Sequence, residues 1–422
     1  MIPTNPPAEC GFVIFLRMNT LDEISAIGYN YDRIGFRTGE CMKIVIAMDS
    51  FKGSLSSSDA GNACAAGILR AVPDAEIKVF PAADGGEGTT EALVQGLNGT
   101  FRTVTASDPL GRPIAGKYGI LPDQTAVIEM AAASGLTLLT ASERNPMHTT
   151  TRGFGEMIAD AIHQGCRRFL LGIGGSATND CGIGCLQALG FAFCDGNGNQ
   201  VPPGAEGMSI VHAIRTENKL PELDDCHFSV ACDVTNPLYG PNGCSTVFAP
   251  QKGADAKDVA IMDQAMQRFA ELVRQYYPDA DPMLSGSGAA GGMGFALRTF
   301  LHADLRSGIS LVMKQSGIES AIVQADIVIT GEGRLDSQSV MGKVPVGIAG
   351  IAKNYHIPVI AFCGCAGNGA GLCNQHGIDA YFPILRQLCS ESEAMDPENA
   401  KQNLADTAEQ VFRLYQLQDR IQ

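Results

Sequence analysis

The feature that most constrains this chain is a series of glycine-rich loops, each following a run of residues with strand character. The clearest is RFLLGIGGSATND at residues 168 to 180, where an apolar run ends in glycines, hydroxyl side chains and an acid. Similar loops are DSFKGS at 49 to 54, ADGGEGT at 83 to 89 and GEGRLD at 331 to 336. Glycine at a strand-to-helix junction exposes backbone N–H groups that bind anions, above all phosphate. The series therefore predicts an α/β fold with a ligand site at the ends of its strands.

The order of the strand-like and helix-like runs indicates how the chain is divided. KIVIAM at 43 to 48, a helix from Ser58 to about Val72 and EIKVFPA at 76 to 82 form a βαβ opening. Short β segments separated by turn signals follow from about residue 100 and are typical of a partly antiparallel domain. We therefore predict a doubly wound parallel-sheet domain built from residues 42–100 and 285–422, with an inserted mixed α/β domain at residues 101–284.

The first 41 residues differ from the rest of the chain. MIPTNPPAEC is rich in proline, and no clear period is present before Met42. We predict that residues 1–41 are an extension that is disordered or not translated, with Met42 as the true start.

Charge and hydropathy exclude two classes of partner. The net charge is −15 without any basic run, which argues against nucleic acid. No stretch approaches the roughly 20 apolar residues of a membrane span, and FVIFL at 12 to 16 lacks the basic flank of a signal peptide. The 14 cysteines are scattered without a CxxC pair and are interpreted as reduced thiols. We expect a cytoplasmic protein that is a monomer or a small homo-oligomer.

One glycine loop leaves a second enzyme class open. GIGGSA at 172 to 177 fits the relaxed dinucleotide pattern GxGxxA, and Asp195 follows at about the distance of a ribose-binding acid. A nucleotide-dependent dehydrogenase is therefore an alternative. Gly182 and Gly184 weaken the helix that this reading requires.

Acids and cations gather in the same loops. The acids are Asp84 and Glu87, Asp233, and Glu332 and Asp336, and the cations are Lys52, Arg112, Arg334 and Lys343. Phosphoryl transfer from a magnesium nucleotide needs a metal held by carboxylates, phosphates held by N–H groups, and cations that spread negative charge. A sugar-acid or nucleotide sensor without turnover is a further class that fits.

The motifs, taken in order, resemble those of the bacterial type I glycerate kinase family. They are DSFKGS (49–54), ADGGEGT (83–89), DPLGR (108–112), GIGGSATND (172–180), CDVTNPLYGPNG (232–243), FAPQKGA (248–254), GAAGGMG (288–294) and GEGRLDSQSVMGKVP (331–345). The resemblance extends from Met42 to about residue 385.

The resemblance implies ATP-dependent, magnesium-assisted phosphorylation of D-glycerate, giving 2-phosphoglycerate, with 3-phosphoglycerate as the alternative product. It also implies a flavodoxin-like domain, an inserted domain likened to restriction endonucleases, and a site in the cleft between them.

Site residues follow as hypotheses from the loops and the resemblance together. The catalytic candidates are Lys52, Asp84 and Asp233. The candidates for substrate binding are Asp49, Ser50, Glu87, Arg112 and Arg334. Phosphate and nucleotide contacts are expected at Gly174, Gly175, Ser176, Thr178, Glu332, Asp336 and Lys343. Asp180 and Asp233 are the candidate magnesium ligands.

Overall fold

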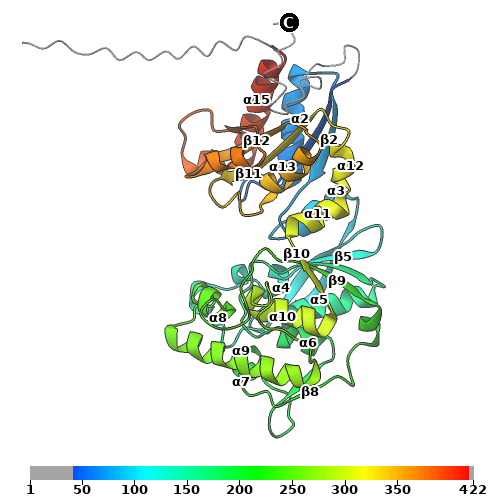
Figure 1. Cartoon of the computed structure of the whole chain (residues 1–422), viewed down its shortest axis with the longest axis vertical. Coiled ribbons are helices and arrows are strands. Elements are labelled where there is room, and N and C mark those ends of the chain that lie inside the picture. Colours follow the sequence, from blue (N-terminus) through cyan, green and yellow to red (C-terminus); the bar gives the residue numbers. More distant parts are fainter. Residues whose placement is uncertain (1–40, 418–422) are drawn as a thin grey trace, which may run out of the picture.

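The computed structural model describes residues 41–417, whose two large β-sheets are stacked along the long axis of the molecule (Figure 1). The chain begins in the first sheet, passes into the second and then returns to complete the first. The predicted extension, apart from Cys41, lies outside the described residues.

The first sheet is parallel, and its strand order is β13-β12-β11-β1-β2. Its strands are β1 (Lys43–Met48), β2 (Glu76–Pro81), β11 (Ile327–Leu335), β12 (Val359–Ala366) and β13 (Ala380–Pro383). Numbered within this sheet alone, the order is 2-1-3-4-5, a common order among doubly wound sheets.

Helices cover both faces of the first sheet because its strands are apolar on both faces. In β1, Ile44 and Ile46 pack toward α2 (Ser57–Ala71) and α15 (Pro397–Tyr415), whereas Val45 and Ala47 pack toward α13 (Val344–Asn354). Strands buried on both faces are the pattern expected of a parallel sheet. Helix α2 begins one residue before the predicted start at Ser58, and the Ser56 hydroxyl oxygen caps it by accepting a hydrogen bond from the Asp59 N–H.

The second sheet is mixed, and its order is β10-β9-β6-β5-β4-β3. Its strands are β3 (Thr100–Ser107), β4 (Pro113–Ile120), β5 (Thr125–Glu129), β6 (Arg168–Gly172), β9 (His227–Ala231) and β10 (Asp304–Arg306). β3, β4 and β5 are antiparallel neighbours, and the other pairs are parallel. The predicted α/β fold with one parallel and one mixed sheet is therefore confirmed.

Helices on one face of the second sheet enclose its main core. They are α5 (Arg152–His163), α6 (Ile183–Ala188), α9 (Ala256–Tyr276) and α10 (Ala289–Leu301). The opposite face is covered by α3 (Thr89–Gly96) and α11 (Gly308–Ser316), which lie between the two sheets (Figure 1). The remaining elements include α4 (Ala131–Ser134), α7 (Gly204–Ser209), α8 (Cys244–Phe248), α12 (Ile318–Ile322), α14 (Glu391–Met395) and a small antiparallel sheet of β7 (Ala192–Cys194) and β8 (Ala213–Arg215).

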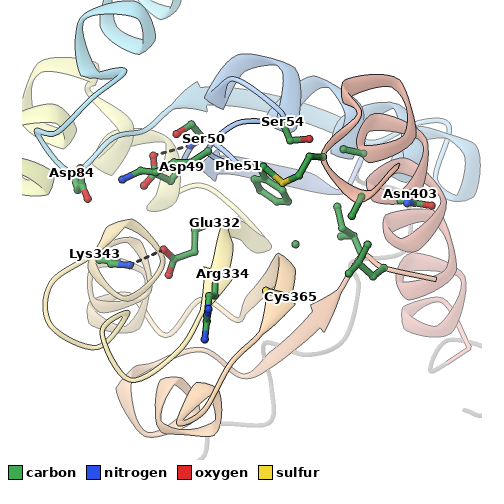
Figure 2. Close-up of a pocket in the computed structure, with 18 residues that line it drawn as sticks. Asp49, Ser50, Phe51, Ser54, Asp84, Glu332, Arg334, Lys343, Cys365 and Asn403 are labelled. Carbon is green, nitrogen blue, oxygen red and sulfur yellow. Dashed lines mark hydrogen bonds and ion pairs between the residues drawn. The ribbon is translucent and has the colours of Figure 1, made fainter. Parts of the chain in front are cut away.

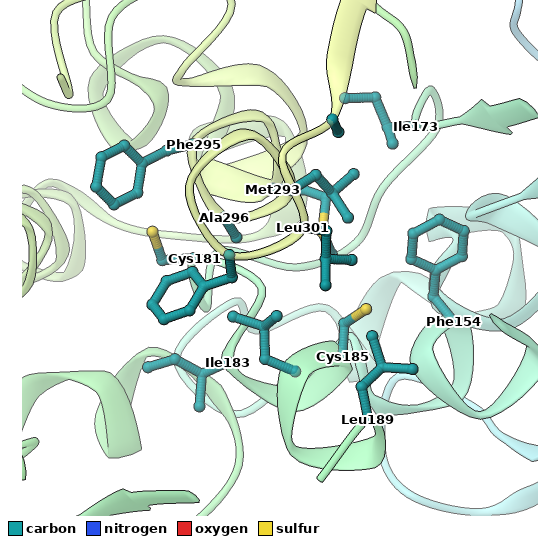
Figure 3. Close-up of a cluster of buried hydrophobic side chains, with 14 of the residues drawn as sticks. Phe154, Ile173, Cys181, Ile183, Cys185, Leu189, Met293, Phe295, Ala296 and Leu301 are labelled. Carbon is teal, nitrogen blue, oxygen red and sulfur yellow. The ribbon is translucent and has the colours of Figure 1, made fainter. Parts of the chain in front are cut away.

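The second sheet and its core extend beyond the approximate limit predicted at residue 285, because residues 285–306 belong with them. β10 pairs with β9. Met293 and Leu301 of α10 join the same core as Cys181 and Cys185 (Figure 3). The chain returns to the first sheet only through α11.

No helix within residues 41–417 is long and apolar enough to cross a membrane.

Candidate functional site

A cavity lies at the edge of the first sheet where the strand order reverses. From β1 the chain adds β2 on one side, and later returns to add β11 on the other. In open α/β sheets, ligands bind at the carboxyl ends of the strands at this switch point. The cavity has a volume of about 310 Å³ (Figure 2). Its wall includes seven predicted site residues: Asp49, Ser50, Lys52, Asp84, Glu332, Arg334 and Lys343.

Asp49 follows the last residue of β1 and is only 6% exposed. Burial raises the pKa of Asp49 to about 7, and the negative charges of Asp84 and Glu332 act in the same direction. The Ser50 N–H, which donates to Asp49 Oδ1 at 2.7 Å, and the charge of Lys52 oppose the shift. A carboxyl group poised near neutral pH can take up a proton during turnover.

Glu332 is the second buried carboxylate of the wall, and it holds a lysine. The Ser339 hydroxyl donates to its Oε1 at 2.5 Å, and Lys343 Nζ donates to its Oε2 at 3.4 Å. Burial raises the pKa of Glu332, while these two partners lower it. Glu332 thereby fixes the Lys343 ammonium group at the cavity wall, beside the start of α13.

Asp84 and Asp233 come from different sheets and lie close together around Gly308. The Gly308 N–H donates to Asp233 Oδ1 at 3.1 Å. A Cβ atom at Gly308 would lie 1.8 Å from the Asp84 carbonyl oxygen. Desolvation raises the pKa of Asp233, and the charge of Asp84 contributes to the shift. Asp84 also lines the cavity. The contact of the Asp84 and Asp233 loops around Gly308, called the junction below, therefore brings the second sheet to the edge of the cavity.

The GIGGSATND loop reaches the same junction with its glycines. A Cβ atom at Gly172 would lie 2.7 Å from the Gly85 carbonyl oxygen, and one at Gly174 would lie 3.5 Å from Gly86 Cα. Gly174 and Gly175 are both exposed. Their backbone groups are therefore accessible beside the ADGGEGT loop.

Ser176 and Thr178 of that loop point inward. Lys252 is 2% exposed, and its Nζ donates to Ser176 Oγ at 2.8 Å and to the Thr178 carbonyl oxygen at 2.6 Å. Burial lowers the pKa of Lys252 to about 8. Thr178 is fully buried, so the structure contradicts its predicted contact with a ligand. Lys252 therefore holds the loop in place from its buried side.

Asp180 is also fully buried, which contradicts its predicted role as a magnesium ligand. Its Oδ2 accepts hydrogen bonds from the N–H and the hydroxyl of Thr151 and from the Gly184 N–H, and its Oδ1 accepts one from the Gly182 N–H. These donors occupy the carboxylate inside the core of the second sheet.

Replacement of Asp180 by asparagine tests this structural role. We expect Asp180→Asn to lower the free energy of unfolding by about 2 kcal/mol. The side-chain amide of asparagine would point an N–H toward one of the N–H or O–H donors that now contact the Asp180 carboxylate. Urea unfolding measures the loss. The magnesium concentration for half-maximal activity should stay unchanged. A rise of tenfold or more in a folded variant would show that Asp180 does bind magnesium.

The other predicted residues either lie outside the cavity or are paired with a neighbouring side chain. Arg112 does not line the cavity, and its guanidinium pairs with Asp108 at 2.5 Å and Glu143 at 2.6 Å. Arg334 Nε lies 3.3 Å from Asp336 Oδ2, and in Figure 2 the Arg334 side chain points away from Asp49. Glu87 is exposed beside a smaller hollow of about 30 Å³ that shares Asp49 and Ser50 with the cavity.

The geometry does not support a dinucleotide fingerprint at GIGGSA. Helix α6 begins only at Ile183, so the glycines do not stand at a helix N-terminus. Asp195 follows β7, which pairs with β8 and not with β6, and its Oδ1 accepts N–H groups of a local turn. The dehydrogenase interpretation requires the acid on a strand next to the glycine loop.

Sequence reasoning missed one end of the cavity. Its wall there includes Phe51, Cys365, Ile384, Leu385, Met395 and Asn403. Most of these residues lie between residues 384 and 403, a segment that contains no glycine-rich loop. The one signal was exposed apolar side chains, at Leu385 in the connection after β13 and at Met395 at the end of α14.

Comparisons with known proteins agree with the motif series. The model of the glycerate kinase family matches residues 44–416. The glycerate 2-kinase of Escherichia coli strain K12 is 46% identical over 354 residues, which is 84% of this chain and 93% of that protein. The glycerate kinase of Bacillus subtilis strain 168 is 44% identical over 371 residues, covering 88% and 97%.

A solved structure agrees as well. The crystal structure of a protein assigned as glycerate kinase 2, from Salmonella typhimurium LT2, superposes with a TM-score of 0.83 at 43% identity. The match covers 90% of this chain and all of that one. The dehydrogenase and sensor alternatives are therefore wrong, and this chain belongs to the glycerate kinase family and is a kinase.

Proposed function

We propose that this kinase transfers the γ-phosphoryl group of ATP to a hydroxyl group of D-glycerate in the cavity at the ends of β1 and β11. The observation that carries the proposal is Asp49, a buried carboxyl group with a pKa of about 7 in the wall of that cavity. General bases work best when their pKa lies near the operating pH. Asp49 would accept the proton of the attacking hydroxyl group.

Three cations of the cavity wall would neutralise the ligands' negative charge. Lys52 is exposed in the loop after β1, and no hydrogen bond or ion pair holds its ammonium group within the described part of the chain. It is free to follow the transferred phosphoryl group or the glycerate carboxylate. Lys343 is held in place by Glu332, and Arg334, which pairs with Asp336, lies on β11 in the same wall. Positioned cations stabilise the charge that spreads over the phosphoryl oxygens.

The junction residues fit a magnesium ion shared with the nucleotide. Asp84 and Asp233 lie close enough for their charges to interact, and neither has a salt bridge among residues 41–417. No group of three acidic, histidine or cysteine side chains that could hold a metal was found in that range. A kinase does not need three such side chains, since Mg²⁺ is usually bound by one or two carboxylates together with substrate phosphates. A bound Mg²⁺ would neutralise phosphate charge during transfer.

The sheet order supports the finer description of the fold. We propose that the first sheet is flavodoxin-like, because its strand order is the one of that fold. The inserted second sheet is proposed to be of the restriction-endonuclease type, and the junction between them forms one side of the site.

The proposed product is 2-phosphoglycerate, in keeping with the name of the Escherichia coli relative. An enolase-coupled assay tests this, since enolase consumes 2-phosphoglycerate directly. We expect a signal without lag when MgATP and D-glycerate are added to the purified chain. A signal that appears only after phosphoglycerate mutase is added would mean that the 3-hydroxyl group is phosphorylated.

A further inference from the structure

We infer that the apolar end of the cavity binds the adenine base of ATP and that Asn403 recognises its hydrogen-bonding edge. The inference rests on the proposed function, because it names the nucleotide that the polar end would serve.

The cavity is divided into two chemically different ends. Figure 2 shows Asp49, Asp84, Glu332 and Lys343 at one end, while Phe51, Cys365 and Asn403 lie toward the other. The wall also includes Ile384, Leu385 and Met395; Ile384 belongs to the same apolar cluster as Phe51, and Met395 lies against the loop that carries Phe51. A ligand that fills both ends must carry a charged part joined to a flat apolar part. A nucleoside triphosphate has this form.

D-glycerate cannot be the ligand of the apolar end. It is a small acid with two hydroxyl groups, and burying such groups against apolar side chains without hydrogen-bond partners costs several kcal/mol each. A purine base instead gains from burial against Phe51 and Met395. The two substrates are thereby assigned to different ends of one cavity.

The loop after β1 joins the two ends. It places Asp49 at the charged end and Phe51 and Ser54 in the wall toward the apolar end. Lys52 also lines the cavity, close enough to Asp49 for its charge to lower the pKa of that carboxyl group. A Cβ atom at Gly53 would lie 2.7 Å from Met395 Cε, so Met395 packs directly over this loop. A nucleotide lying along the loop would reach from the apolar wall to the lysine.

Asn403 supplies the polar group that a base requires. It projects from α15 at the far end of the cavity, and its side-chain amide makes no hydrogen bond within residues 41–417. An amide offers one acceptor and two donors, which complement the N6 amino group and a ring nitrogen of adenine. Guanine presents donors where adenine presents an acceptor, so a carboxylate at this position would favour guanine.

Base selectivity tests this assignment. For Asn403→Asp, the ratio of kcat/KM for ATP to that for GTP should fall at least about tenfold, with an unchanged KM for D-glycerate. Gln410→Glu, which adds the same charge to the exposed side of α15, should leave the ratio within about twofold. An unchanged ratio in Asn403→Asp would overturn the role of Asn403.

Alkylation of Cys365 provides a readout that needs neither turnover nor a variant. In the full 422-residue chain, Cys365 is exposed in the cavity wall, whereas Cys41 is exposed at the opposite end of the first sheet. We expect ADP to slow iodoacetamide labelling of Cys365 at least about fivefold without protecting Cys41, and D-glycerate alone to protect neither. Labelling that is unaffected by ADP in an enzyme that phosphorylates glycerate would overturn the base site while the proposed function stands. Protection by ADP in a protein that phosphorylates no glycerate would support the base site and refute the proposed function.

Discussion

Asp49→Asn should remove almost all activity and at the same time stabilise the protein. Asparagine cannot accept the hydroxyl proton, so kcat/KM should fall by about a thousandfold. The same change removes a buried negative charge that faces Asp84 and Glu332. Sites built for catalysis commonly sacrifice stability in this way.

The stabilisation should depend on pH in a defined direction. The pKa of Asp49 is raised from 3.8 to about 7 in the folded protein, so the folded state binds more protons than the unfolded state between these values. Wild-type stability is therefore lost as pH rises from about 4 to about 7. Asp49→Asn avoids this loss, and its advantage should reach up to about 4 kcal/mol at pH 8 and vanish near pH 3. Urea unfolding of metal-free protein across this range measures the difference.

Asp160→Asn is the matched control for Asp49→Asn. The Arg102 guanidinium, whose Nε lies 2.6 Å from Asp160 Oδ2, holds the pKa of Asp160 below its usual value. Removing that charge should destabilise the protein at pH 8 and leave kcat/KM within about threefold. If Asp49→Asn behaved like this control, losing stability while keeping activity, Asp49 would not be the base.

Gly308→Ala should damage both the fold and the site, although it adds a single methyl group. That group would lie 1.8 Å from the Asp84 carbonyl oxygen and 2.9 Å from Gly85 Cα. Backbone atoms cannot yield as a side chain can, so we expect a loss of about 3 kcal/mol in the free energy of unfolding. The displaced junction carries Asp84 and Asp233, and kcat/KM should fall about a hundredfold.

Gly350→Ala separates this effect from the general consequence of replacing a glycine. Gly350 lies within α13, and a Cβ atom there would have no atom within 4 Å. This variant should gain up to about 1 kcal/mol and keep full activity. Thermal unfolding and steady-state kinetics of the two variants decide the matter. Normal activity in Gly308→Ala would show that the junction does not position the acids.

The sequence predicted the loops that surround the site better than the direction in which their side chains point. DSFKGS and GIGGSATND look alike as text, yet Asp49 faces the cavity while Asp180 is enclosed in the second core. The difference is due to Thr151 and Lys252, which are distant in sequence. From the core side they donate hydrogen bonds to the Asp180 carboxylate and to the Thr178 carbonyl oxygen of the second loop. Local patterns identify a glycine turn after a strand, but long-range packing decides which side of it faces a ligand.

The segment beyond the approximate limit at residue 285 was assigned to the first sheet for a similar reason. Residues 285–306 are rich in glycine and small apolar residues, as a returning βα unit would be, but β10 has only three residues and pairs with β9. Three residues carry too little alternation to be assigned to a sheet from sequence alone. The apolar end of the cavity was missed because Met395 and Asn403 come from helices near the chain end, where sequence periodicity indicates a core face and not a ligand wall.

The most direct test of the account is ADP release from MgATP by the purified chain with and without D-glycerate, compared between wild type and Asp49→Asn. We expect release that depends on D-glycerate in the wild type and is reduced about a thousandfold in a folded Asp49→Asn protein. Equal release with and without D-glycerate in the wild type, or full activity in Asp49→Asn, would contradict it.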